Sequence, residues 1–101
     1  MQDPILRKIF LAFIQVHILY HAQKEPIYGS WMMEELNNHG YDISPGTLYP
    51  IFHNMENEGL LISQKNQVNG KIRKYYSITN KGIDNLKSAK EKIKELSYEI
   101  K

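Results

Sequence analysis

The sequence contains no cysteine. This absence excludes disulfides and metal sites built from thiolates, and it is typical of a protein from a reducing cytosol. The motifs of several enzyme classes are missing as well. There is no nucleophile elbow, no glycine-rich loop for phosphate and no zinc-protease helix. The sequence therefore does not predict an enzyme.

Long hydrophobic runs are also absent. The run Ile9–Ile14 is far shorter than the ~20 residues of a membrane span, and charged and polar residues flank it. No secretory signal precedes it. The length of 101 residues and the 24% of charged residues indicate one ordinary soluble domain. We therefore expect a cytoplasmic protein with no membrane partner.

The charges are unevenly distributed along the chain. Residues 1–59 hold three bases and seven acids, a net charge of −4, whereas residues 60–101 hold ten bases and four acids, a net charge of +6. A basic half indicates a polyanionic partner such as nucleic acid. A lysine-rich surface helix is the alternative, since it would produce much of the same asymmetry.

Two helices are expected in the first 40 residues. Residues 5–23 are apolar almost all the way round, so this helix must be covered on more than one side. A partner subunit is the cover that we favour, and burial within the monomer is the alternative. Pro26 ends the first helix. The second starts at Tyr28–Ser30, with Ser30 as a candidate N-cap, and stops near Gly40.

A third helix is expected over residues 44–57. Ser44 suits the N-cap position, Pro45 suits the first helical position and Gly59 ends the helix. Pro50 removes the hydrogen bond to the carbonyl of Gly46, a change that a helix tolerates if its first turn contacts a partner. A plain structural kink is the alternative. The apolar residues recur at helical spacing: Leu48, Ile51, Phe52 and Met55.

A β-hairpin and a last helix follow. Leu60–Lys65 and Ile72–Ile78 are the expected strands, joined by the hairpin signal Asn69-Gly70, and Tyr76 and Ile78 are expected to point inward. Thr79 caps a helix with one long apolar stripe that suits pairing with another helix. The expected fold is mostly α with a small β-hairpin. Its element order, helix-helix-helix-strand-strand-helix, is that of a winged helix-turn-helix. We expect residues 1–80 to form a DNA-binding domain and residues 81–101 a dimerisation helix.

The outward face of the third helix is free of carboxylates near its electropositive N-terminus. Its hydroxyl, imidazole and amide groups can reach phosphates or base edges. Cations of the hairpin can bridge phosphates beside it, although a charged edge that discourages aggregation is the alternative. The expected DNA-binding residues are Ser44, Gly46, Thr47, Tyr49, Pro50, His53, Asn54, Lys65, Lys71, Arg73 and Lys74.

Four segments carry a family resemblance. Pro26–Gly29 (PIYG), Gly40–Ile51 (GYDISPGTLYPI), Glu58–Leu61 (EGLL) and Arg73–Gly82 (RKYYSITNKG) resemble the PadR family of bacterial winged-helix transcriptional regulators. The resemblance runs from about residue 5 to about residue 86. It implies a homodimeric repressor that is held together by its first and last helices and binds an inverted-repeat operator in double-stranded DNA.

The resemblance also assigns roles to residues. It places Thr47, Tyr49 and Pro50 on the recognition helix, and Arg73 and Lys74 on the wing. The chain departs from the family pattern at three positions. Asn54 stands where a basic residue is usual, and Ser30 and Trp31 replace a tyrosine and an acidic residue. With a single C-terminal helix, the chain resembles the short branch of the family.

The first and last helices supply the candidate dimer interface, which comprises Ile5, Ile9, Phe13, Ile83, Leu86, Ile93, Leu96 and Ile100. Phe10 and Trp31 are candidates to line an apolar pocket for a small-molecule effector, with core packing as the alternative. His17 and His21 have a spacing that can hold a metal, but no acid lies near them in sequence, so we expect surface or packed histidines and no cofactor. Two rival functions are a winged helix that binds only protein and a metal-sensing regulator.

Overall fold

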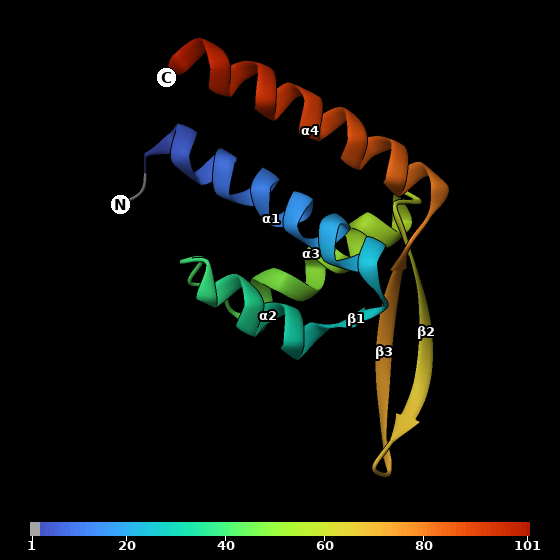
Figure 1. Cartoon of the computed structure of the whole chain (residues 1–101). Helices are drawn as coiled ribbons and strands as arrows, with labels where there is room; N and C mark the ends of the chain where they lie inside the picture. The colour runs from blue at the N-terminus through green and yellow to red at the C-terminus, as the bar shows by residue number, and fades with distance from the viewer. Residues whose placement is uncertain (1–2) are drawn as a thin grey trace.

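The computed structural model describes residues 3–101, which form four α-helices and three β-strands (Figure 1). The elements are α1 (Pro4–Lys24), β1 (Ile27–Tyr28), α2 (Gly29–Asn38), α3 (Pro45–Asn57), β2 (Leu61–Val68), β3 (Lys71–Ile78) and α4 (Asn80–Ile100). The predicted order of three helices, a hairpin and a last helix is confirmed.

The three strands form one antiparallel sheet in the order β1-β3-β2. Strands β2 and β3 make the predicted hairpin, which projects from the helices as an arm (Figure 1). We call this arm, Leu61–Ile78, the wing. At its tip Asn69 and Gly70 have φ angles of 52° and 77°. Both lie in the left-handed region that a tight two-residue hairpin turn requires.

Strand β1 is the element that the sequence did not predict. Ile27 pairs with Tyr76 and Tyr28 pairs with Tyr75, on the edge of β3 opposite to β2. A strand of two residues is too short to show alternation, and it forms because β3 offers it an edge. Helix α2 follows directly at Gly29 and therefore begins beside the wing. It has Tyr28 at its N-cap position, so the prediction that Ser30 caps this helix is wrong.

One hydrophobic core lies between the helices and the sheet. Phe52 of α3 stacks on Tyr76 of β3 with ring centroids 4.4 Å apart, and Tyr76 is buried, as predicted. Ile78 packs against the same core. The other buried residues are Ile14, Ile18, Leu19, Ala22, Ile27, Met32, Leu36, Ile43, Leu48, Met55, Leu61 and Leu86. The core thus takes residues from every helix and strand.

A hydrogen-bond network joins the start of α4 to the end of α3. The Thr79 hydroxyl donates to the carbonyl of Gly59 (2.5 Å) and accepts from the backbone N–H of Gly82 (3.0 Å), which confirms Thr79 as the N-cap. The Lys81 ammonium donates to the carbonyl of Glu58 (2.7 Å). These bonds fix the direction in which α4 leaves the sheet.

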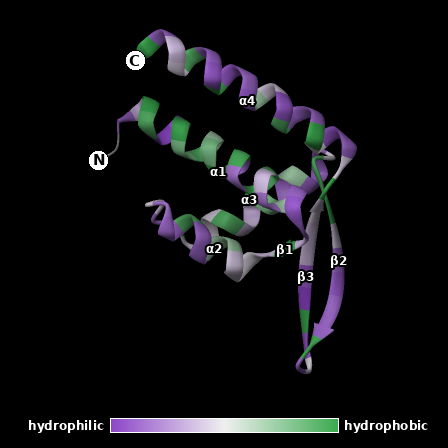
Figure 2. Cartoon of the chain, viewed as in Figure 1, coloured by the Kyte–Doolittle hydropathy of each residue, from purple (hydrophilic) through white to green (hydrophobic). Residues whose placement is uncertain are grey.

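Helices α1 and α4 lie side by side and run antiparallel (Figure 1). Hydrophobic residues recur along α1, whereas the wing is mostly hydrophilic (Figure 2). In residues 3–101, α1 is the one helix that is long and apolar enough to cross a membrane by length and composition alone. The short apolar run Ile9–Ile14 is thus part of a longer apolar helix. Core helices of soluble proteins pass the same test, and α1 buries Ile14, Ile18, Leu19 and Ala22 in the core.

Most candidate dimer residues are exposed in the single chain. They are Ile5, Ile9 and Phe13 on α1 and Ile83, Ile93, Leu96 and Ile100 on α4. Leu86 is different, because it is 1% exposed and belongs to the core. The first turns of α4 pack on α1 and β3, which covers this side chain. Leu86 is therefore a core residue, and its prediction as an interface residue is wrong.

Replacing Gly82 by alanine is expected to destabilise the fold by about 1–3 kcal/mol, the usual cost of overpacking. A Cβ on Gly82 would clash with the carbonyl oxygen of Leu60 and would lie 2.6 Å from Cγ1 of Ile78. The matched control is Gly46→Ala, because the nearest atom to its Cβ is 3.8 Å away. Urea denaturation measures both variants. Equal stability of Gly82→Ala and the wild type would contradict this account of the junction.

Candidate nucleic-acid interface

Helix α3 separates its apolar and polar residues as its spacing predicts. Leu48, Phe52 and Met55 are buried. The helix continues through Pro50, so this proline does not end it. The exposed residues include all seven candidates on this segment: Ser44, Gly46, Thr47, Tyr49, Pro50, His53 and Asn54. The exposed side of the first three turns therefore carries neutral polar groups and no carboxylate.

The N-terminus of α3 is open to solvent. Ser44 occupies the N-cap position as predicted, but its hydroxyl accepts no hydrogen bond from the helix backbone. It lies 3.4 Å from the hydroxyl of Thr47 instead. The unpaired N–H groups of a helix N-terminus carry a partial positive charge that favours anions. Exposed hydroxyls surround these groups, so this turn suits a phosphate.

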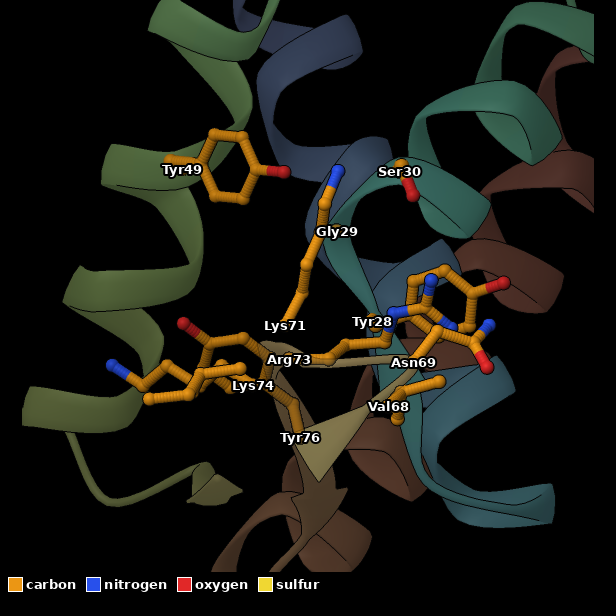
Figure 3. A pocket seen from close by; sticks show the side chains of 11 residues that line it. Tyr28, Gly29, Ser30, Tyr49, Val68, Asn69, Lys71, Arg73, Lys74 and Tyr76 are labelled. Atoms are coloured by element: carbon orange, nitrogen blue, oxygen red, sulfur yellow. The ribbon is translucent and has the colours of Figure 1, made fainter. Parts of the chain in front are cut away.

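Tyr49 lies between α3 and the start of α2 (Figure 3). A Cβ built on Gly29 would lie 2.7 Å from Cζ of the Tyr49 ring. The hydroxyl end of the ring therefore lies in the space that a side chain at position 29 would fill, and any larger residue there would require Tyr49 to shift. Tyr49 is still 46% exposed. The hydroxyl end of the ring is placed beside Gly29, and the rest of the ring remains available to a ligand.

A hollow opens between Tyr49, the start of α2 and the wing (Figure 3). The cations Lys71, Arg73 and Lys74 line it together with Ser30. Strand β1 covers only the inner end of β3, so the outer half of this edge is left to the hollow. Sequence reasoning missed Ser30 as a site residue, because only the pairing of β1 with β3 brings it beside the wing.

The four candidate cations of the wing do not form one cluster. Successive residues of a strand point to opposite faces. Lys65 is paired with Lys74 across the hairpin, so these two share one face. Arg73 lies on the other face, with its guanidinium 4.0 Å from the centre of the Tyr28 ring. Lys65, on β2, does not line the hollow.

Lys74 is partly neutralised by a carboxylate of α3. Its ammonium lies 3.8 Å from Glu56. The backbone N–H and the hydroxyl of Ser63 also donate to Glu56, at 3.2 and 2.6 Å. The hydroxyl bond, helped by the charge of Lys74, lowers the pKa of Glu56 below its ordinary 4.5. Lys71 and Arg73 are therefore the wing cations best able to meet a phosphate.

The remaining candidates lie apart from this hollow or have local partners. Phe10 and Trp31 do not share a pocket: Phe10 packs edge-on against Tyr41 and Trp31 packs edge-on against His21. His53 is exposed, and its Nε2 lies 3.2 Å from the side-chain amide of Asn57. A single effector pocket lined by Phe10 and Trp31 is thus not formed within one chain.

Comparison with known proteins agrees with this geometry. The model of the transcriptional regulator PadR-like family matches residues 18–88. A curated relative, the transcriptional regulator Rv3488 of Mycobacterium tuberculosis, is 39% identical over 95 residues, which cover 94% of this chain and 89% of that protein. This chain belongs to the PadR-like family of transcriptional regulators. Members of this family are DNA-binding regulators and not enzymes.

Solved structures of PadR-like proteins share the fold. A PadR-like transcription factor from Bacteroides fragilis superposes with a TM-score of 0.82 at 28% identity, covering 97% of this chain and 96% of that chain. A PadR-like transcriptional regulator from Bacillus cereus gives a TM-score of 0.83 at 30% identity, covering 92% of each chain. The winged helix-turn-helix predicted from the sequence is confirmed.

Glu56→Gln is expected to lower the stability of this PadR-like chain at neutral pH by about 1 kcal/mol, because a charged acceptor becomes a neutral one. The pKa of Glu56 is lowered in the folded state, so its contribution is complete above about pH 4.5 and is lost as the pH falls through the folded-state value. Thermal unfolding measured across this pH range should show that the stabilities of the wild type and Glu56→Gln become equal in acid. Glu58→Gln, at the exposed end of α3, is the control. A constant difference at every pH would contradict the assignment.

Proposed function

We propose that this protein is a homodimeric transcriptional repressor of the bacterial cytoplasm that binds an inverted-repeat operator. Residues 1–80 form the DNA-binding unit, and residues 81–101 are the dimerisation helix. One observation carries the proposal: Tyr49, on the exposed side of α3, and the wing cations Lys71, Arg73 and Lys74 line the same hollow. A duplex on this side meets both elements at once.

In this proposal α3 enters the major groove with its N-terminal half first. The open turn at Ser44 and Gly46 meets a phosphate. Thr47, Tyr49 and Asn54 offer hydroxyl and amide groups to base edges, which are the groups that read sequence in the major groove. The packing of Tyr49 on Gly29 limits the motion of its ring, so the contact costs little conformational entropy.

The wing lies beside the duplex backbone and reaches the minor groove. Lys71, next to the hairpin tip, and Arg73, farther along β3, supply the cations. Arg73 is held over the Tyr28 ring before DNA arrives, so its position is set in advance. Contacts of this kind add affinity without reading sequence. Lys65 and Lys74 have smaller roles, because one lies off the hollow and the other faces Glu56.

The dimer forms through the exposed apolar sides of α1 and α4. Soluble monomers rarely leave large contiguous apolar patches uncovered, and both helices carry exposed isoleucine, leucine or phenylalanine along their length. Pairing them with a second copy places two α3 helices on one side of the dimer, about 34 Å apart for successive major grooves. An apolar effector that enters between the subunits would release the DNA by changing this spacing.

Removing the wing cations Lys71 and Arg73 together, in the variant Lys71→Ala with Arg73→Ala, is expected to weaken binding to operator and random duplexes alike. The slope of log affinity against log salt should become shallower by about 4, since the variant dimer lacks four phosphate contacts and each contributes roughly 0.9. Gel shifts at several salt concentrations measure the slope. The control variant is Lys87→Ala with Lys92→Ala, which removes the same number of positive charges from the exposed side of α4.

An unchanged slope in the wing variant would remove the wing from the interface. If the wild type binds no duplex at physiological salt, the rival function as a protein-interaction module replaces this one. Selection of bound sequences from a random duplex pool would give the operator.

Leu96→Glu is expected to weaken dimerisation on the order of 100-fold, because an uncompensated buried carboxylate costs several kcal/mol. Leu96 is 50% exposed on α4. Sedimentation of a dilution series measures the effect. Ile62→Glu makes the same change at a residue of β2 that is 61% exposed, and this variant should dimerise normally. A dimeric Leu96→Glu protein would show that the interface lies elsewhere.

A further inference from the structure

The fold gathers three of the chain's four histidines at one place between α1 and α2. His17 and His21 lie one turn apart on α1, and His39 follows the end of α2. One ring nitrogen from each of the three lies within 4.8 Å of the other two. Glu35 of α2 joins them: its Oε2 is 3.4 Å from Nε2 of His21 and 3.1 Å from Nε2 of His39. The expectation from the sequence depended only on acids near His17 and His21 along the chain, whereas the fold brings Glu35 beside His21 from another helix.

We propose that His17, His21, His39 and Glu35 form a binding site for a divalent transition-metal ion of the Zn²⁺, Co²⁺ or Ni²⁺ class. Imidazole nitrogens and a carboxylate oxygen are the ligands that such ions take. Two ligands on a tetrahedral ion with bonds of about 2.0 Å lie about 3.3 Å apart. The two distances from Glu35 to the imidazoles are close to this separation, and the three histidine nitrogens, which lie within 4.8 Å of one another, would draw together around an ion.

A salt bridge alone does not explain the cluster. Two imidazoles point at one carboxylate oxygen, and if both were protonated they would repel each other and His17 beside them. In a neutral ring the Nε2–H donates to Glu35, as in the 3.1 Å hydrogen bond of His39, and moving that proton to Nδ1 frees the Nε2 lone pair for a metal. The three histidines and Glu35 line a second hollow, separate from the one beside the wing. Lys24 and Lys90 also border this second hollow, but their ammonium groups lie 4.3 and 6.0 Å from the centre of the Tyr20 ring. Glu35 supplies the negative charge that an incoming cation needs.

The surroundings hold the ligands and leave an entrance. The His17 ring lies 5.3 Å from the Tyr41 ring and the His21 ring lies 5.3 Å from the Trp31 ring, both edge-on. The side chain of His21 is only 14% exposed, whereas that of His39 is 48% exposed. His39 can therefore turn to close the site over an ion that enters from solvent. Trp31, a candidate for an effector pocket, instead supports a metal ligand.

A bound ion would tie α1 to α2. Helix α1 carries the exposed apolar side proposed for the dimer, and α2 packs against α3, which is proposed to bind DNA. An ion shared by α1 and α2 would fix the angle between these two surfaces. Metal occupancy would therefore change DNA affinity, a consequence that rests on the function proposed above.

Titration of the metal-free, tag-free full chain with Co²⁺ tests the site directly, because Co²⁺ in a site of this geometry gives intense visible absorption. The expected result is one ion per chain. His39→Ala and Glu35→Gln should each weaken Co²⁺ binding by more than about tenfold. Loss of a residue that only supports a metal ligand already weakens binding by about tenfold, and loss of a ligand should weaken it more. His53→Ala removes the remaining histidine, which lies on α3, and should bind as the wild type does.

Thermal unfolding without metal shows whether each variant is folded, and His39 is the most exposed ligand and the safest to replace. The site is overturned if the wild type binds no stoichiometric Co²⁺. It is also overturned if the folded variants His39→Ala and Glu35→Gln bind as tightly as the wild type.

Gel shifts with and without Zn²⁺ test the coupling separately. The wild type should change its DNA affinity with Zn²⁺, and His39→Ala should not. An unchanged affinity of the metal-loaded wild type overturns the coupling but leaves the site standing. A complete lack of DNA binding overturns the proposed function, and the Co²⁺ spectrum remains an independent measure of the site.

Discussion

The interface depends on the double pairing of strand β3. This strand pairs with β1 on one edge and with β2 on the other, and its Tyr76 stacks on Phe52 of α3. One strand thereby fixes α3, the start of α2 and the wing relative to one another. Because β1 is only two residues long, the outer half of β3 keeps an open edge. The cations of the hollow lie along that edge.

Local signals in the sequence predicted the helices and the hairpin well. Asn69-Gly70 forms the turn, Thr79 caps α4 and Pro45 begins α3, because each depends only on its immediate neighbours. The features that the sequence did not predict depend on contacts between residues far apart in the chain. Strand β1 exists through pairing with residues almost 50 positions later, and the burial of Leu86 follows from how α4 packs on α1 and β3. No periodicity in the sequence records such contacts.

The same division holds for the candidate sites. The exposed face of α3 was predictable because helical spacing alone separates it from the buried face. The division of the wing cations between two faces depends on strand register, which the sequence left open. The histidine cluster combines two i, i+4 pairs, His17 with His21 and Glu35 with His39. Each pair is visible in the sequence, but only the packing of α1 on α2 brings them together.

The contact between Gly29 and Tyr49 has an evolutionary consequence. The hydroxyl end of the ring occupies the space that any side chain at position 29 would need, so position 29 gains a side chain only where Tyr49 moves or is replaced by a smaller residue. Among relatives, a larger residue at position 29 should appear where position 49 is small, and a tyrosine at position 49 should appear with glycine at position 29. The two positions would then covary, although 20 residues separate them in the chain.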